Sequence, residues 1–266
     1  MKAADLWLSR PRSRRAPARL RLFCLPYAGG GAQIYRSYAQ ALPADVEVSA
    51  VLLPGREKRF LEPALDSVDA IVDQLARVMA EQVDLPYAIF GHSLGALVGF
   101  ELVRRLRNEG RPLPVRLFAS GHRAPHVPDP DPPIRHLPDA QFIEELRKLN
   151  GTPQEAFESP ELLELLLPML RADFTAAETY AYCSDAPLPC PITALGGASD
   201  DMVTAEALQA WEQHTSGDFE YHVLQGDHFF IHQCHDEVMR ILRDRITQVL
   251  GDVDGGRRRM PPAGTA

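Results

Sequence analysis

The run YAIFGHSLGALVGFELVRRLRN, from Tyr87 to Asn108, fixes the class of fold. Its first part, Tyr87 to Phe90, is continuously apolar, which predicts a strand buried on both faces. Its last part, Ala96 to Asn108, has helical periodicity, and Gly110 follows where a glycine often ends a helix. The pentapeptide GHSLG at 91–95 therefore lies on a predicted strand-to-helix turn, with Ser93 at its centre.

Ser93 is the predicted nucleophile. Glycines on both sides permit the sharp turn and strained backbone that hold a serine Oγ above a sheet. The N-terminus of the following helix directs its dipole and free N–H groups at developing negative charge. Because a G-x-S-x-G match arises by chance in roughly one chain in ten of this size, the interpretation depends on the flanking strand and helix.

Further strands and helices alternate along the chain. Val/Ile/Leu/Phe-rich runs predict strands at Arg21–Pro26, Val46–Leu53, Val115–Ser120, Ile192–Gly196 and Phe219–Leu224. Helices are predicted at Val68–Val83 and from about Asp236 to Leu250. This alternation predicts an α/β fold with a mostly parallel central sheet and helices on both faces.

The interval at about 122–188 interrupts the alternation, because no convincing strand is found in it. Helical patterns occur at Asp139–Leu149 and Ser159–Thr179, and the second is rich in leucine. These leucines are either ordinary packed core or one face of an inserted helical lid that lines an acyl pocket. We favour the lid, since insertions and loops concentrate over active sites.

Two residues are predicted to activate Ser93. A serine hydroxyl is a poor nucleophile until a base takes its proton, and in this fold class the partners follow in the order Ser, Asp/Glu, His. Asp200 follows the next-to-last predicted strand, and His228 follows the last one. Open α/β sheets place their sites at these carboxyl ends. The predicted triad is Ser93, Asp200 and His228, with the adjacent Asp201 as the alternative acid.

An oxyanion hole needs two backbone N–H donors. One is assigned to Leu94, the residue after the nucleophile. The other is assigned to Ala28, in the glycine loop YAGGG at residues 27–31, where glycines let the backbone approach a substrate. A phosphate-binding role for this loop is disfavoured, because the pattern G-x-x-x-x-G-K-[ST] is absent.

A metal site is the alternative for the histidines near the C-terminus. His228, His232, Cys234 and His235 have helix-like spacing. However, the chain has no H-E-x-x-H motif, and acidic ligands do not cluster there. We therefore expect neither a metal nor a cofactor.

Composition disfavours several other classes of protein. The 266 residues, 45% of them hydrophobic, suffice for one α/β domain, and the net charge of −8 argues against nucleic-acid binding. No run approaches the roughly 18 apolar residues of a membrane span, and the apolar LWL at 6–8 is too short for a signal peptide. The four scattered cysteines are expected to be thiols. We expect a cytoplasmic monomer.

The predicted organisation has three parts. Residues 1–20 form an arginine-rich arm, partly disordered, although Trp7 is a candidate for contact with the body. Residues 21–250 form the domain with its insertion, and 251–266 form a disordered tail. Binding of a polyanion by the arm is disfavoured, because the body is acidic.

Six runs between about Trp7 and Leu250 carry a resemblance to a known family. They are LPYAGG (25–30), LPGR (53–56), GHSLG (91–95), SGHRAP (120–125), LRADF (170–174) and GDHFF (226–230). Together they resemble the stand-alone (type II) thioesterases of polyketide and nonribosomal peptide assembly lines, in the α/β-hydrolase superfamily. Asp227 is a departure, since this family often has a second glycine there.

The resemblance implies both an activity and a partner. Members of the family hydrolyse acyl thioesters from the phosphopantetheine arms of carrier proteins and so clear stalled or wrongly primed units. Acyl or peptidyl carrier domains are thus the expected partners, and the phosphopantetheine arrives with the substrate.

Three other interpretations stay open. A lipid or small-ester hydrolase would fit the triad equally well. A malonyl-type acyltransferase shares GHSLG but usually begins with a G-Q-G run, which is absent here. A non-catalytic scaffold that binds carrier proteins is disfavoured by the intact Ser, Asp and His set.

Overall fold

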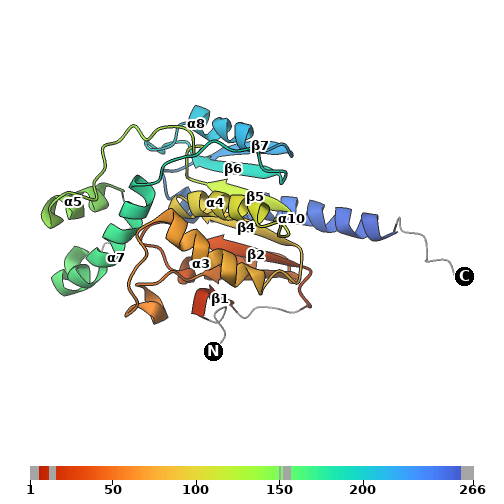
Figure 1. The fold of residues 1–266 in the computed structure, drawn as a ribbon, viewed down its shortest axis with the longest axis horizontal. Helices are drawn as coiled ribbons and strands as arrows, with labels where there is room; N and C mark the ends of the chain where they lie inside the picture. The colour runs from red at the N-terminus through yellow and green to blue at the C-terminus, as the bar shows by residue number, and fades with distance from the viewer. Residues whose placement is uncertain (1–5, 12–15, 150, 152–156, 259–266) are drawn as a thin grey trace, which may run out of the picture.

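A seven-stranded sheet forms the centre of the molecule (Figure 1). The computed structural model describes residues 6–11, 16–149, 151 and 157–258, and it describes side chains up to residue 251. The order of the strands in the sheet is β1-β3-β2-β4-β5-β6-β7. The strands are β1 (Leu8–Ser9), β2 (Leu20–Leu25), β3 (Val46–Val51), β4 (Tyr87–His92), β5 (Arg116–Ser120), β6 (Ile192–Gly197) and β7 (Phe219–Leu224). β1 is antiparallel to β3, and every other neighbouring pair is parallel. The predicted, mostly parallel sheet is confirmed.

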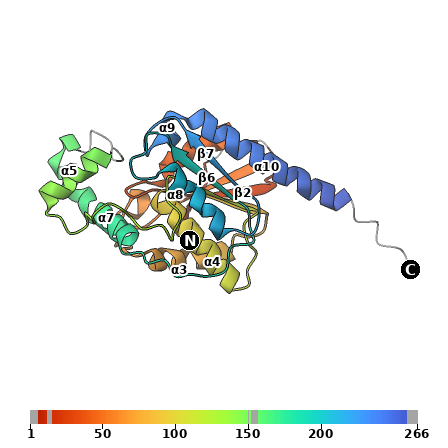
Figure 2. The ribbon, with the colours of Figure 1, turned by 90° about the horizontal axis from the view of Figure 1, so that it is seen from above.

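Helices cover both faces of the sheet (Figure 2). One face packs against α3 (Val68–Ala80), α4 (Leu94–Asn108) and α8 (Ala205–Gln209). The other packs against α2 (Tyr38–Ala41), α9 (Phe230–Gln233) and α10 (His235–Arg258). Strands β2 to β6 are buried along their whole length, as their apolar runs predict. Among the described residues, no helix has the length and apolar character needed to cross a membrane.

The last helix is longer than its periodicity indicates. α10 continues to Arg258, past the expected end at Leu250 and through Gly255 and Gly256. A glycine inside a helix costs about 1 kcal/mol relative to alanine, which weakens a helix without necessarily ending it. Of the tail expected at 251–266, residues 259–266 lie outside the described residues.

The N-terminal boundary also differs from the expected one at residue 20. Trp7 is only 6% exposed, and its ring centroid lies 4.2 Å from the guanidinium carbon of Arg59. The carbonyl of Trp7 accepts a 2.8 Å hydrogen bond from the N–H of Leu52. Part of the predicted arm therefore belongs to the sheet and its core, because Trp7 and Leu8 bury apolar side chains there.

Between β5 and β6 the chain forms the predicted insertion (residues 122–188). Its helices α5 (Asp139–Leu149) and α7 (Pro160–Glu178) lie together at one end of the molecule, on the left in Figures 1 and 2. They have an apolar cluster of their own, which includes Phe142, Leu146, Phe157, Leu163, Met169 and Leu170. Much of the leucine-rich face is thus packed core, whereas Leu162 and Leu165 are exposed.

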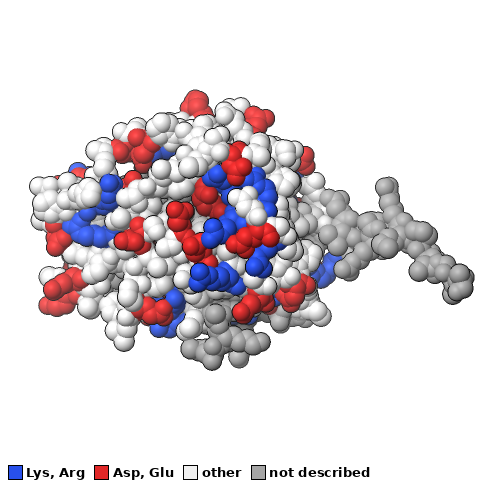
Figure 3. Space-filling model, viewed as in Figure 1, with Lys and Arg blue, Asp and Glu red and all other residues white. Residues whose placement is uncertain are grey.

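Surface charges are mixed in sign on the face of Figure 3. Four arginines on or just after α4 are paired with acids: Arg104 with Glu101, Arg105 with Asp73, Arg107 with Asp185 and Arg111 with Glu109. Such interspersed pairs produce no broad field of one sign on this face.

Candidate active site

Ser93 lies on a strained turn between β4 and α4. Its backbone has φ 53° and ψ −119°, a conformation that costs energy in a non-glycine residue. Its N–H donates a 2.8 Å hydrogen bond to the carbonyl of Ser120 at the end of β5. Such strain is typical of a nucleophile elbow, which lifts the hydroxyl out of the helix and above the sheet.

The glycines beside Ser93 are required by close backbone contacts. A Cβ on Gly91 would lie 2.0 Å from the carbonyl oxygen of Gly95. A Cβ on Gly95 would lie 2.2 Å from the carbonyl oxygen of Leu25. Both contacts are with backbone that cannot move aside, so the G-x-S-x-G pattern here is a steric requirement of the turn.

Asp200 and His228 meet beyond the ends of two neighbouring strands. β6 and β7 pair in parallel, with Gly197 opposite Leu224, so their following loops emerge side by side. The Nδ1 of His228 lies 2.9 Å from Oδ2 of Asp200, whose side chain is fully buried. The other carboxylate oxygen accepts the N–H of Met202 at 2.9 Å. Because Asp200 is held from both oxygens, it can fix the tautomer and orientation of the imidazole.

Asp201, the alternative acid, is exposed to solvent. The structure therefore brings Asp200, and not its neighbour, to His228. This contact supports the predicted pairing of Asp200 with His228.

His92 adjoins the site without having been predicted there. Its ring centroid lies 5.3 Å from that of His228, and its Nδ1 lies 2.9 Å from the Ser120 Oγ. Burial lowers the pKa of His92 well below its ordinary value, so the ring is neutral. Gly121 is needed beside it, because a Cβ there would lie 2.4 Å from the imidazole. The presence of a histidine directly before the predicted nucleophile was the sequence feature that could have indicated its contact with His228.

The glycine loop follows β2 and faces the same edge of the sheet. A 2.8 Å hydrogen bond from the Gly30 N–H to the Tyr27 carbonyl closes the turn, and Gly29 has φ +79°. Within the described part of the chain, no group accepts a hydrogen bond from the N–H of Ala28 or Leu94. Both N–H groups thus remain available to a ligand, as an oxyanion hole requires.

The possible metal ligands near the C-terminus have separate partners. His232 Nε2 lies 3.1 Å from the hydroxyl of Tyr27, and the Cys234 thiol donates to the carbonyl of Gln225 at 2.8 Å. His228 is engaged with Asp200. No three His, Cys, Asp or Glu side chains of the described ranges are grouped so that they could hold a metal ion.

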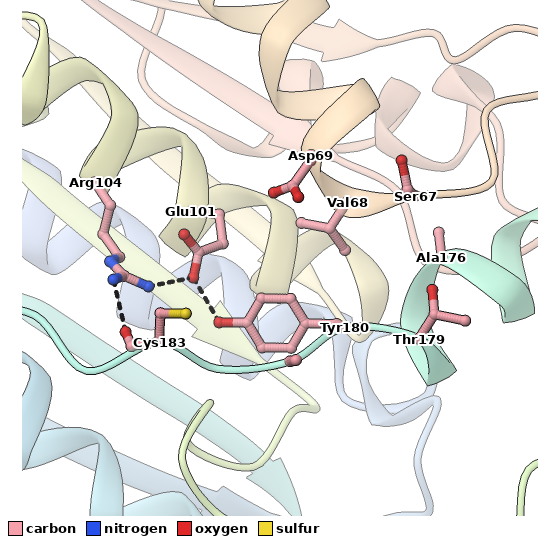
Figure 4. A pocket seen from close by; sticks show the side chains of 10 residues that line it. Ser67, Val68, Asp69, Glu101, Arg104, Ala176, Thr179, Tyr180 and Cys183 are labelled. Atoms are coloured by element: carbon pink, nitrogen blue, oxygen red, sulfur yellow. Dashed lines mark hydrogen bonds and ion pairs between the residues drawn. The ribbon is translucent and has the colours of Figure 1, made fainter.

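A cavity of about 290 Å³ lies away from the triad, where the chain leaving α7 crosses α3 and α4 (Figure 4). Glu101 at its wall accepts hydrogen bonds from Arg104 at 2.6 Å and from the hydroxyl of Tyr180 at 2.5 Å. Arg104 also donates to the carbonyl of Cys183 at 2.7 Å. Neither Ser93 nor His228 lines this cavity. These hydrogen bonds hold the C-terminal part of the insertion against α4.

Comparison with known proteins assigns the family. A family profile described as "Thioesterase domain" matches residues 20–248. The chain belongs to this thioesterase family. Its six motif runs therefore belong to a thioesterase domain that spans most of the chain.

Curated relatives and solved structures of similar proteins match this thioesterase over nearly its whole length. Gramicidin S biosynthesis protein GrsT of Aneurinibacillus migulanus is 42% identical, with 88% of this chain and 91% of GrsT covered. The type II thioesterase BorB from the borrelidin biosynthetic cluster is 38% identical with a TM-score of 0.83, covering 90% of this chain and 97% of BorB. The predicted α/β-hydrolase fold and the resemblance to type II thioesterases are confirmed.

One relative of the thioesterase has a name that indicates different chemistry. Linear gramicidin dehydrogenase LgrE of Brevibacillus parabrevis is 47% identical, with 92% of this chain and 94% of LgrE covered. A dinucleotide-binding turn has the pattern G-x-G-x-x-G after the first strand. The loop after β2 instead reads YAGGGAQI at 27–34. The sequence of this loop does not match that pattern.

Proposed function

We propose that this thioesterase hydrolyses acyl groups from the phosphopantetheine arms of carrier proteins and so removes stalled or mis-primed units in polyketide or nonribosomal peptide synthesis. The observation that carries the proposal is the buried Asp200–His228 contact at the sheet edge where the elbow presents Ser93. Relatives named for gramicidin S and borrelidin biosynthesis support the choice of pathway.

In the first half-reaction, the Ser93 Oγ attacks the thioester carbonyl. His228 takes the hydroxyl proton on Nε2, because its Nδ1–H is held by Asp200. The negative charge on the carbonyl oxygen is stabilised by the N–H groups of Leu94 and Ala28, each worth on the order of 10²–10³ in rate. Collapse of the intermediate breaks the C–S bond, and the pantetheine thiolate leaves with the proton from His228.

In the second half-reaction, water attacks the acyl-Ser93 ester. His228 takes a proton from the water and returns it to the Ser93 Oγ as the ester bond breaks. The products are a carboxylic acid and a carrier protein with a free pantetheine thiol. The proposal needs no cofactor of the enzyme's own, since every proton moves between these side chains, substrate and water.

The choice of a thioester substrate rests on the family rather than on the triad, because the same three side chains also hydrolyse oxygen esters. The family match favours thioesters. We also place the reaction in the cytoplasm, where the free thiols of Cys24, Cys183, Cys190 and Cys234 would persist.

The test compares three substrates with the same acyl group: acyl-carrier protein, acyl-pantetheine and the p-nitrophenyl ester. We expect the highest kcat/KM with the carrier protein and loss of turnover in Ser93→Ala with all three. Full activity of Ser93→Ala would refute the mechanism. Hydrolysis of the p-nitrophenyl ester without any response to the carrier would refute the substrate and leave the triad standing.

A further inference from the structure

A buried ion pair joins the insertion to the loop after β3. Arg56 of that loop and Asp173 of α7 form two parallel hydrogen bonds, from Nη2 to Oδ1 at 2.7 Å and from Nη1 to Oδ2 at 2.8 Å. Asp173 is 0% exposed and Arg56 is 5% exposed. Bidentate pairs of this kind fix both side chains in distance and in orientation.

Both members of the pair also bind the backbone of the glycine loop. Oδ2 of Asp173 accepts the N–H of Gly29 at 2.7 Å, and Nη1 of Arg56 donates to the carbonyl of Gly30 at 3.0 Å. The residue immediately before Gly29 is Ala28, whose N–H is the predicted oxyanion donor. The ion pair therefore binds one backbone group of each of the two residues that follow the donor.

The neighbouring residues of α7 fit the same two loops. A Cβ on Gly29 would lie 2.6 Å from Cδ2 of Leu170, so this leucine packs directly on the glycine. A Cβ on Gly55, the residue before Arg56, would lie 3.4 Å from Cγ of Met169. Because Asp173 follows Leu170 by three residues and Met169 by four, it lies on the same side of the helix as each of them. This side of α7 packs against the glycine loop through Leu170 and Asp173.

We infer that Asp173 and Arg56 are positioning residues that hold the Ala28 N–H in the oxyanion hole and make its position depend on α7. The inference rests on the proposed function, since it concerns the same oxyanion hole. An oxyanion donor acts only when it is fixed at hydrogen-bond distance from the developing charge. A displacement of about 1 Å in such a group lowers the rate by about 10²-fold. If α7 moves away, the glycine loop loses the Asp173 carboxylate and the Leu170 contact together.

The competing interpretation is an ion pair that only stabilises the fold. The chain provides a matched control in Arg21 and Glu47, which are 7% and 8% exposed and lie 2.5 Å apart between Nε and Oε1. These residues lie opposite each other on the paired strands β2 and β3, at the second position of the ladder, away from the carboxyl ends that carry the site. If activity falls only because a buried ion pair is broken, the loss should be the same for Arg21–Glu47 as for Arg56–Asp173.

The experiment measures hydrolysis of acyl-carrier protein and the rate at which a fluorophosphonate labels Ser93, beside the folded fraction by circular dichroism. For Asp173→Asn and Arg56→Lys we expect kcat to fall by about 10²-fold with KM within about twofold of wild type. Fluorophosphonate labelling should slow in parallel, because its phosphoryl oxygen occupies the same hole. Glu47→Gln should keep both rates once corrected for the folded fraction.

The double variant Arg56→Met/Asp173→Leu keeps the test decisive if the single variants unfold. Replacing a buried pair by apolar side chains often preserves stability, yet it leaves the Gly29 N–H without its acceptor. We expect a folded protein with the same 10²-fold loss. A folded variant with wild-type labelling and kcat would overturn the inference. Labelling of Ser93 does not involve the acyl-carrier protein. If the wild-type enzyme fails to hydrolyse that substrate, the proposed function is refuted, but the labelling rates still test the role of Asp173 and Arg56.

Discussion

His228 Nδ1 lies 2.9 Å from Oδ2 of Asp200, while the adjacent Asp201 is exposed to solvent. The two acids differ by one position in sequence, and only one reaches the imidazole. Asp200→Asn should lower kcat by about 10⁴-fold, because an amide favours the wrong tautomer of His228. Asp201→Asn is the matched control and should retain kcat within about twofold. Equal losses in steady-state assays of the two variants would contradict the assignment.

Gly29 combines a left-handed backbone with direct contact to Leu170. Gly29→Ala should therefore lower kcat by about tenfold or more, since the methyl group must displace either the loop or α7. Gly110→Ala isolates the backbone effect, because Gly110 has φ +65° and a Cβ there would meet no described atom within 4 Å. This control should cost about 1–2 kcal/mol in stability and leave kcat unchanged. Kinetics and urea unfolding of both variants distinguish the two contributions.

Stability should depend on pH through the buried His214 and the half-buried His122. Burial, together with the charge of His126, lowers the pKa of His214 from 6.5 to about 4, and burial lowers that of His122 to about 4 as well. Between pH 6.5 and about 4 the unfolded chain binds more protons than the native one, so the contribution is complete above 6.5 and is lost as pH falls.

Urea unfolding at several pH values tests this dependence. We expect the free energy of unfolding to be lower at pH 5 than at pH 7 by on the order of 1–2 kcal/mol for His214 alone. His214→Gln should flatten the profile in part, and His136→Gln, at an exposed position, should keep it. A profile of His214→Gln as steep as that of wild type would rule out this residue as the source.

Trp7 should stabilise the domain without affecting the chemistry. Trp7→Ala removes a buried side chain and its contact with Arg59, and the expected loss is about 3 kcal/mol in the free energy of unfolding. The kcat of the folded enzyme should stay within about twofold of wild type. Leu61→Ala, at a side chain that is 95% exposed, should be neutral in the same unfolding experiment. An unchanged midpoint for Trp7→Ala would show that residues 6–9 are dispensable.

Local patterns were sufficient to predict most of the fold. Each predicted strand is present, with ends displaced by a few residues at most, because apolar runs between helices can satisfy burial only inside a covered parallel sheet. The turn at Ser93 was equally predictable. Its glycines are required by close contacts with the backbone of the same turn and of the adjacent strand β2. The end of helix α10 and the start of the sheet at Leu8 were harder to predict, because distant packing and weak end signals set those boundaries.

The sequence alone determined the class of fold and the place of Ser93 on its turn, because both depend on patterns of residues close together in the chain. It also predicted Asp200 and His228 as partners, since each follows a predicted strand. Although the sequence already favoured Asp200 over Asp201, the tertiary structure shows which acid reaches His228, since that contact depends on where two separate loops meet. It alone joined Arg56 to Asp173, which are 117 positions apart in the chain. Their pairing depends on the docking of α7 against the glycine loop, and side-chain periodicity carries no information about contacts at that separation.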